Sequence, residues 1–200
     1  MSRTEAPLLV IINGPPASGK TTLGMTLSAA SGLPFLTKDG FKELLADALN
    51  VEGVEWSAKL GAASFELLYH VALHLLVAGN SVMLEGNFNA ERSSEPVQQV
   101  LRETGAVAIQ IMCRADGDLL IERYQGRNCS NRRHTIHLDE FHAGDEPFRA
   151  RLRAGQIAPL DLDGQIFEVN TSQFDTIDIA GLISKIKQQL PRTRTVDGRG

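Results

Sequence analysis

The sequence contains little cysteine, no excess of positive charge and no hydrophobic run long enough to cross a bilayer. Its two cysteines, Cys113 and Cys129, lack C-x-x-C spacing, which argues against a zinc cluster or a redox pair and favours a reducing cytoplasm. Twenty Lys and Arg against 24 Asp and Glu give a net charge of −4, so the chain has no general attraction for nucleic acid or anionic lipid. The longest apolar stretch, residues 65–78, is interrupted by Glu66 and is shorter than the roughly 20 residues of a membrane helix.

The length and composition predict a single globular domain over residues 1–190. A chain of 200 residues with 42% hydrophobic and 22% charged residues is large enough to bury roughly 70% of its unfolded surface. The last segment, residues 191–200, contains three arginines and almost no apolar residue, so we expect it to be a disordered tail.

Short apolar runs alternate with amphipathic stretches and glycine-containing turns along the chain, which is the rhythm of βαβ units in an α/β fold. The runs that we interpret as strands are residues 8–12, 33–36, 81–84, 107–112 and 165–169. Helical spacing is found over residues 20–30, 41–49, 56–78, 94–103, 116–125 and 177–190. Residues 126–145 are polar and basic without clear periodicity, and a connection of this length predicts a mobile or functional segment such as a lid.

The most specific motif follows the first predicted strand. Residues 14–21 read G-P-P-A-S-G-K-T and match G-x-x-x-x-G-K-[ST] at every fixed position, between a strand and a helix as the motif requires. Such a loop surrounds a phosphate with backbone N–H groups and places it at the positive end of a helix. A chance match is expected in only roughly 1% of chains of this length, so we interpret the segment as a phosphate-binding P-loop.

The P-loop predicts ATP and Mg²⁺ as cofactors. Lys20 would bridge the β- and γ-phosphates, and the hydroxyl of Thr21 would ligate Mg²⁺. The predicted nucleotide-binding residues of this segment are Gly14, Pro15, Pro16, Ala17, Ser18, Gly19, Lys20, Thr21 and Thr22.

Two acidic residues, Asp39 and Glu85, each follow a predicted strand. The carboxyl ends of parallel strands form one crevice in which ligands bind, so both should face the P-loop. We expect Glu85 to hold Mg²⁺ or its water shell, although a carboxylate in this position can also cap a turn. We expect Asp39 to accept the proton of a substrate hydroxyl, and its structural alternative is the N-cap of the helix that follows.

Three polar residues are weaker candidates for substrate contacts. Asn87 and Asn89 lie in the turn after Glu85 and could bind a substrate through hydrogen bonds, or simply form the turn. His70 lies on the long helix predicted from residue 56, where we interpret it as lining an apolar pocket. His70 and His74 have the spacing of a zinc pair but lack the glutamate of H-E-x-x-H, which argues against a metal.

Arginines are concentrated between residues 123 and 153, at positions 123, 127, 132, 133, 149, 151 and 153. Because guanidinium is permanently charged and binds phosphate in a bidentate manner, arginines on a closing lid can stabilise a transferring phosphoryl group. We assign this role to Arg127, Arg132 and Arg133, and interpret the last three arginines as a solvated face. His134 and His137 lie in the same segment, where they could contact phosphate or be exposed.

The chain resembles a bacterial family of small P-loop kinase-like proteins that are called AAA-type ATPases and are similar to gluconate kinase, shikimate kinase, chloramphenicol phosphotransferase and zeta-toxin kinases. The resemblance is carried by residues 14–22, Lys38-Asp39 with Lys42-Glu43, residues 81–88, residues 113–116, Arg133-His134 with His137, and residues 159–162. Many relatives read Arg-His-Pro-Gly-His where this chain has residues 133–137.

The resemblance implies a three-layer P-loop NTPase fold with five parallel strands in the order 2-3-1-4-5 and a lid after the helix that follows strand four. It implies that an acid at the position of Asp39 contacts or deprotonates the acceptor. It also implies that arginines matching Arg123, Arg127 or Arg133 bind ATP, and that the loop containing Thr171 lies near the adenine.

These observations together predict an ATP- and Mg²⁺-dependent phosphotransferase that acts on a hydroxyl of a small molecule in the cytoplasm. A nucleotide-dependent switch that hydrolyses ATP slowly and signals through a partner is the alternative. A polynucleotide 5′-hydroxyl kinase is disfavoured by the net negative charge, although a local arginine groove could suffice. The sequence leaves open the identity of the acceptor and the oligomeric state.

Overall fold

A computed structural model describes residues 6–128, 134–138 and 144–191 of the chain. Five parallel strands form one sheet in the order β2-β3-β1-β4-β5, which confirms the predicted order. The strands are β1 (Leu8–Asn13), β2 (Phe35–Thr37), β3 (Val82–Glu85), β4 (Val107–Arg114) and β5 (Gln165–Asn170). Each lies within three residues of its predicted position, because short buried apolar runs bounded by turns are a strong strand signal.

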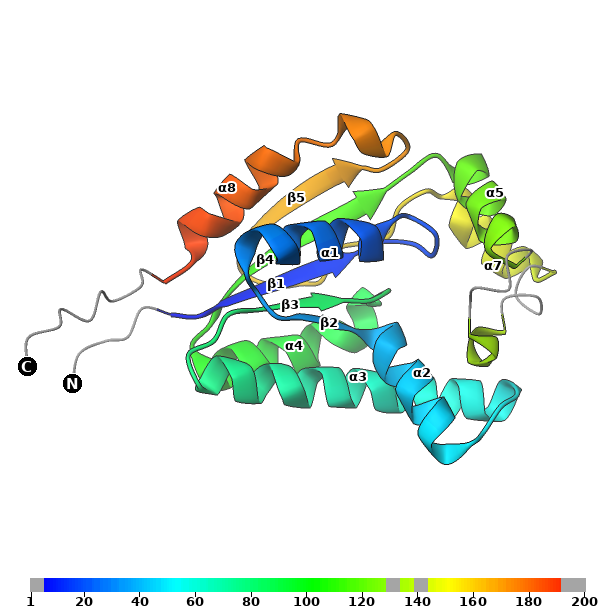
Figure 1. Ribbon diagram of the computed structural model, residues 1–200, viewed down its shortest axis with the longest axis horizontal. Coiled ribbons are helices and arrows are strands. Elements are labelled where there is room, and N and C mark those ends of the chain that lie inside the picture. The colour runs from blue at the N-terminus through cyan, green and yellow to red at the C-terminus, as the bar shows by residue number, and fades with distance from the viewer. Residues whose placement is uncertain (1–5, 129–133, 139–143, 192–200) are drawn as a thin grey trace, which may run out of the picture.

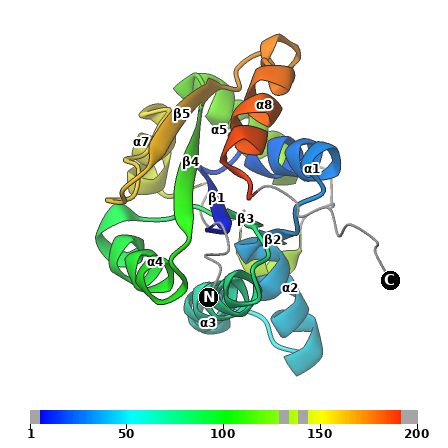
Figure 2. The ribbon, with the colours of Figure 1, turned by 90° about the vertical axis from the view of Figure 1, so that its left-hand side faces the viewer.

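Helices cover both faces of this sheet. The α-helices are α1 (Lys20–Ser31), α2 (Lys38–Leu49), α3 (Val54–Val77), α4 (Ala90–Thr104), α5 (Gly117–Asn128), α7 (Glu146–Arg153) and α8 (Ile179–Gln189). Two short 3₁₀ helices are η1 (Thr135–His137) and η2 (Phe174–Thr176). Figure 2 shows α1 and α8 on one face of the sheet and α3 and α4 on the other.

The central strand β1 is buried on both faces, which explains why its sequence is continuously apolar. Val10 and Ile12 point toward α1 and α8 and join a core cluster that includes Leu23. Leu9 and Ile11 point the opposite way and pack in the cluster formed by α3 and α4. The two hydrophobic layers therefore meet at β1 and hold this strand in place between them.

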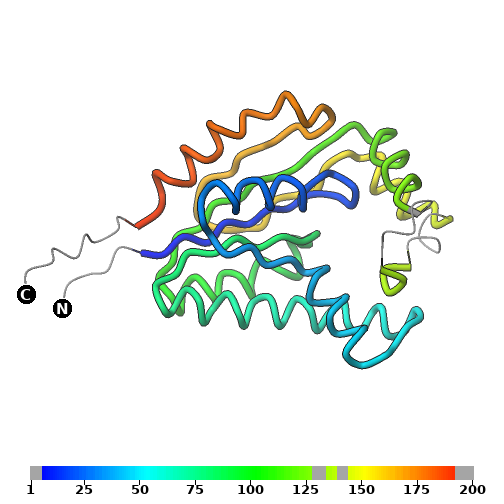
Figure 3. The backbone as a smooth tube through the Cα atoms, in the orientation of Figure 1, coloured from blue at the N-terminus to red at the C-terminus, as the bar shows by residue number. Residues whose placement is uncertain are grey.

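The carboxyl ends of the strands face a group of helices at one end of the molecule. In Figure 1 the arrowheads point toward α5 and α7, and α2 begins directly after β2 on the same side. The backbone trace in Figure 3 shows the chain leaving the sheet after β4 to form α5 and returning through α7 before β5. The segment over 126–145, expected to be irregular, includes the end of α5 and the 3₁₀ helix η1 within its described part.

By length and composition, α3 is apolar enough to span a membrane, and no other helix in the described ranges is. One face of it, formed by Leu60, Leu68, Ala72 and Leu76, is buried in the core. This agrees with the predicted core-facing helix.

A buried asparagine fixes the transition from β1 to the P-loop. Asn13 is fully buried, and its Oδ1 accepts hydrogen bonds from the backbone N–H groups of Gly14 and Phe88, each at 2.9 Å. Its Nδ2 donates to the carbonyl of Phe88 at 3.1 Å. One side chain thus holds the start of the P-loop against the turn that follows β3.

We expect Asn13→Ala to lower the free energy of unfolding by about 3 kcal/mol, because it leaves two buried N–H groups and one buried carbonyl without their partner. The control is Asn89→Ala, which removes the exposed N-cap whose side chain accepts from the N–H of Arg92 and should cost about 1 kcal/mol. Urea denaturation measures both. Equal losses in the two variants would contradict the role assigned to Asn13.

Candidate active site

The P-loop adopts a backbone that only small residues tolerate. Gly14 has φ of 151°, and a Cβ there would collide with the carbonyl oxygen of Cys113. Ala17 and Gly19 also have positive φ, at 62° and 80°. Alternation between right- and left-handed conformations turns successive N–H groups into an anion-binding concavity, and α1 begins directly behind it at Lys20.

Lys20 is buried at the front of α1 with 8% of its surface exposed. Its Nζ donates to the carbonyl of Pro15 at 2.9 Å and lies 3.9 Å from Oε1 of Glu85. Burial lowers the pKa of Lys20, and the nearby carboxylate of Glu85 partly opposes this shift. A phosphate entering the concavity would restore a close counter-charge to this desolvated ammonium.

Thr21 and Glu85 place two oxygen-bearing side chains next to each other, at the start of α1 and the end of β3. The Oγ1 of Thr21 donates to Oε2 of Glu85 at 3.2 Å, and Glu85 is 6% exposed. A hydroxyl and a carboxylate suit Mg²⁺, which is commonly bound by one or two protein groups together with phosphate oxygens and water. Nowhere in the described ranges do three His, Cys, Asp or Glu side chains gather as metal ligands.

The P-loop also contains a polar atom that no described protein group satisfies. The Oγ of Ser18 is buried and has no hydrogen-bond partner in the part of the chain that the structure describes. A buried hydroxyl of this kind normally finds a partner. Ser18 itself is fully buried and does not line the cavity described below.

The opposite wall of the site is built by the first turns of α2. Thr37 is the N-cap of this helix, and its Oγ1 accepts from the N–H of Gly40 at 3.0 Å. The alternative role of Asp39 as N-cap is therefore wrong, because Asp39 lies inside the first turn. Its Oδ1 accepts from Nζ of Lys38 at 3.2 Å, and one turn further Lys42 donates to Oγ of Ser57 at 2.7 Å.

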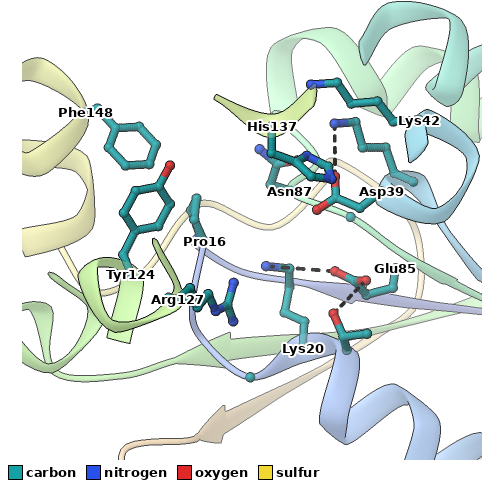
Figure 4. Close-up of a pocket in the computed structure, with 15 residues that line it drawn as sticks. Pro16, Lys20, Asp39, Lys42, Glu85, Asn87, Tyr124, Arg127, His137 and Phe148 are labelled. Atoms are coloured by element: carbon teal, nitrogen blue, oxygen red, sulfur yellow. Dashed lines mark hydrogen bonds and ion pairs between the residues drawn. The ribbon is translucent and has the colours of Figure 1, made fainter. Parts of the chain in front are cut away.

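One cavity joins these two walls. It is lined by Pro16, Ala17, Gly19, Lys20, Thr21, Lys38, Asp39, Lys42, Glu85, Gly86, Asn87, Tyr124, Arg127, His137 and Phe148. Figure 4 shows Lys20 and Glu85 between the acidic and basic groups of α2 on one side and Arg127 on the other. The structure thus brings together most of the predicted P-loop residues with the predicted Asp39, Glu85, Asn87 and Arg127.

Several predicted positions do not line the cavity, among them Gly14, Pro15 and Ser18 of the P-loop. His70 is exposed on the outer face of α3, where its ring lies 4.5 Å from that of His74, so the expectation that it lines the pocket is not met. The physical reason is helical phase, because His70 lies about 200° around the helix from the buried Leu68. Thr22 is exposed on α1 and does not line the cavity.

The loop after β5 is held to α5 rather than open to a ligand. Arg123 donates from Nη2 to the carbonyls of Thr171 and Ser172 at 3.1 and 3.0 Å. Thr171 is fully buried, and its Oγ1 donates to the carbonyl of Arg114 at 3.0 Å. The predicted contacts of Arg123 and Thr171 with nucleotide stay predictions. The predicted lid arginines Arg132 and Arg133 lie outside the described residues.

The cavity also contains side chains that were not predicted as site residues. Lys38 and Lys42 are four residues apart, and this spacing could have placed them on one face of α2 beside Asp39. Tyr124 and Phe148 come from α5 and α7, with ring centroids 4.9 Å apart. Nothing in the local sequence indicates that pair, because it depends on the packing of two helices separated along the chain.

The sequence and the fold of this chain are similar to those of known proteins. A family profile described as an AAA domain matches residues 9–149. A protein from Chloroflexus aurantiacus, which its own description assigns to the kinases only provisionally, is 36% identical with a TM-score of 0.85, over 92% of this chain and 99% of that one. A search of the curated proteins gave no match.

Two more distant structures share the fold alone. Kti12 from Chaetomium thermophilum, solved in complex with ADP-AlF3, is 16% identical with a TM-score of 0.62, over 92% of this chain and 100% of that one. A sugar kinase from Janibacter is 15% identical with a TM-score of 0.52, over 92% and 94%.

The fold and the P-loop thus define a P-loop NTPase of the kinase type. Within that class, the chain belongs to the AAA-domain family whose profile it matches. This confirms the resemblance that the sequence motifs indicate.

We expect Cys113 to be unreactive toward thiol reagents in the folded protein. Burial beneath the P-loop raises the pKa of its thiol to about 12, and only the thiolate reacts. In the variant Cys129→Ser, where Cys113 is the sole thiol, a disulfide reagent at about pH 8 should react only after denaturation. If the native variant reacted at the rate of a small free thiol, Cys113 would be accessible to solvent, which would contradict its burial beneath Gly14.

Proposed function

We propose that this protein is an ATP- and Mg²⁺-dependent phosphotransferase that phosphorylates a hydroxyl group of a small molecule, acting in the cytoplasm. The observation that carries the proposal is that one cavity is lined both by Lys20, Thr21 and Glu85 and by Asp39. A phosphate donor and a proton acceptor in one cavity are what phosphoryl transfer to a hydroxyl requires.

The donor side of the reaction follows from the P-loop. The loop N–H groups and Lys20 would hold the β- and γ-phosphates, and Arg127 would neutralise charge that develops on the transferring group. Thr21 and Glu85 would hold Mg²⁺, which when bound neutralises phosphate charge.

The acceptor side is formed by α2 and the turn after β3. Asp39 would take the proton of the attacking hydroxyl while the oxygen forms its bond to phosphorus and the bond to ADP breaks. Lys38 donates a hydrogen bond to the same carboxylate. Asn87 lines the cavity beside Asp39 and supplies amide donors and acceptors for a polar acceptor.

We expect Lys20→Ala to lose Mg·ATP binding at concentrations at which the wild type saturates, because the ammonium is the cation of the loop. Isothermal titration calorimetry measures this directly. The matched control is Lys59→Ala, since Lys59 is an exposed lysine that pairs with Glu55 and should bind like the wild type. Undiminished binding by Lys20→Ala would refute the assignment of the phosphate loop.

We expect Asp39→Asn to lower phosphoryl transfer by about 10²- to 10⁴-fold and to leave Mg·ATP affinity within about twofold, because the amide cannot accept the proton. The assay incubates labelled ATP with hydroxyl metabolites, nucleosides, sugars and antibiotics and determines product mass. Asp47→Asn, two turns along the same helix and outside the cavity, is the control. ADP formation without any phosphorylated product in the wild type would favour a nucleotide-dependent switch instead.

A further inference from the structure

A histidine from the lid segment reaches the acceptor side of the cavity. His137 is the last residue of η1, lines the cavity, and is 6% exposed. Its Nε2 lies 2.7 Å from Oε1 of Glu43, and its Nδ1 lies 3.9 Å from Oδ1 of Asp39. Figure 4 shows its ring beside Asp39 and Asn87.

The contact with Glu43 determines which nitrogen of His137 faces the reaction. A carboxylate only accepts hydrogen bonds, so Nε2 must carry the proton in a 2.7 Å contact with Glu43. In the neutral ring Nδ1 is then the unprotonated nitrogen, which can accept a proton. It is also the nitrogen nearer Asp39. A carboxylate that orients an imidazole in this way is the arrangement of a general base.

The segment that carries His137 is anchored firmly enough to hold this orientation. Ile136 is fully buried in a cluster with Ala46 and Leu60, between α2 and α3. His134, at the other end of η1, accepts from the N–H of Ile136 at Nδ1 and contacts Asp47 through Nε2 at 2.9 Å. Two histidines therefore bind carboxylates one turn apart on α2, but only His137 lines the cavity.

We propose that His137, oriented by Glu43, accepts on Nδ1 the proton that Asp39 takes from the acceptor hydroxyl; this inference rests on the proposed function. The hydroxyl O–H bond breaks, its oxygen forms the bond to the γ-phosphorus, and the electron pair of the broken P–O bond leaves with ADP. When the 3.9 Å between Oδ1 of Asp39 and Nδ1 closes to hydrogen-bond distance in the complex with substrates, the proton passes from the carboxyl to Nδ1, and Asp39 returns to its charged form. The resulting imidazolium lies between the carboxylates of Glu43 and Asp39, which stabilise its charge.

The proposal explains why two carboxylates of α2 converge on one buried imidazole. A proton that has passed to Nδ1 of His137 is removed from Asp39 and cannot return directly to the product. A histidine that only held the segment in place would need the contact with Glu43 alone. It would not need Nδ1 to face Asp39.

The first arm of the test uses the nucleotide-free protein. Long-range ¹H–¹⁵N spectra of the five histidines, assigned by comparison with His137→Gln, report which ring nitrogen carries the proton. We expect the Nε2–H form for neutral His137. An Nδ1–H form would overturn the proposal.

The second arm measures phosphoryl transfer by His137→Gln, with the acceptor found in the screen or, without one, with water. The glutamine amide keeps a donor for Glu43 but has no base in the place of Nδ1. We expect kcat to fall about 10- to 100-fold with the KM for Mg·ATP unchanged. The control His74→Gln, at an exposed position of α3 that does not line the cavity, should keep kcat within about twofold of the wild type.

The outcomes separate the two proposals. Equal kcat values for His137→Gln and His74→Gln, in a preparation whose wild type is active, would overturn the role of His137 and leave the proposed function intact. A wild type that binds Mg·ATP but transfers phosphate to no acceptor, water included, would overturn the proposed function and this role with it.

Discussion

The desolvated ammonium of Lys20 is the interaction on which the rest of the site depends. It is buried at the start of α1, where a Pro15 carbonyl and the carboxylate of Glu85 partly replace the water it has lost. A buried charge is costly unless it is paired, so the P-loop, the end of β3 and α1 must meet at one point. Asn13 fixes that meeting by binding both the loop and the turn after β3.

The order of the strands then divides the site into two sides. β1 lies at the centre, and the chain turns to one side of it for β3 and β2 and to the other for β4 and β5. Ligands bind where the strand order reverses in this way. The β2 side supplies Asp39 and Lys42 through α2, whereas the β4 side supplies Arg127 through α5. Under the proposed function, donor phosphate and acceptor would therefore be held by different parts of one sheet.

Sequence reasoning predicts well what local pattern controls. The five strands and the P-loop follow from apolar runs and from a motif whose glycines are required sterically, as the approach of Gly14 to Cys113 shows. The order of the strands follows only from the resemblance to a known family. The burial of one face of α3 follows from the spacing of Leu68, Ala72 and Leu76. That same spacing places His70 on the opposite face, a consequence which the prediction of a pocket-lining histidine overlooked.

What the sequence does not reveal depends on contacts between distant segments. The N-cap of α2 is Thr37 and not Asp39 because β2 extends to Thr37, one residue beyond the predicted end of the apolar run. The burial of His137 depends on Ile136 inserting between α2 and α3, and a pattern search over a polar segment cannot detect this. Tyr124 and Phe148 meet only because α7 packs on α5.

A crystal structure with Mg²⁺ and a non-hydrolysable ATP analogue tests the central claim most directly. The account predicts that the triphosphate lies in the concavity of residues 14–20, that Nζ of Lys20 leaves the carbonyl of Pro15 for a phosphate oxygen, and that the cation lies between Thr21 and Glu85. A nucleotide bound elsewhere, with Lys20 still on Pro15 and the loop closed, would contradict it.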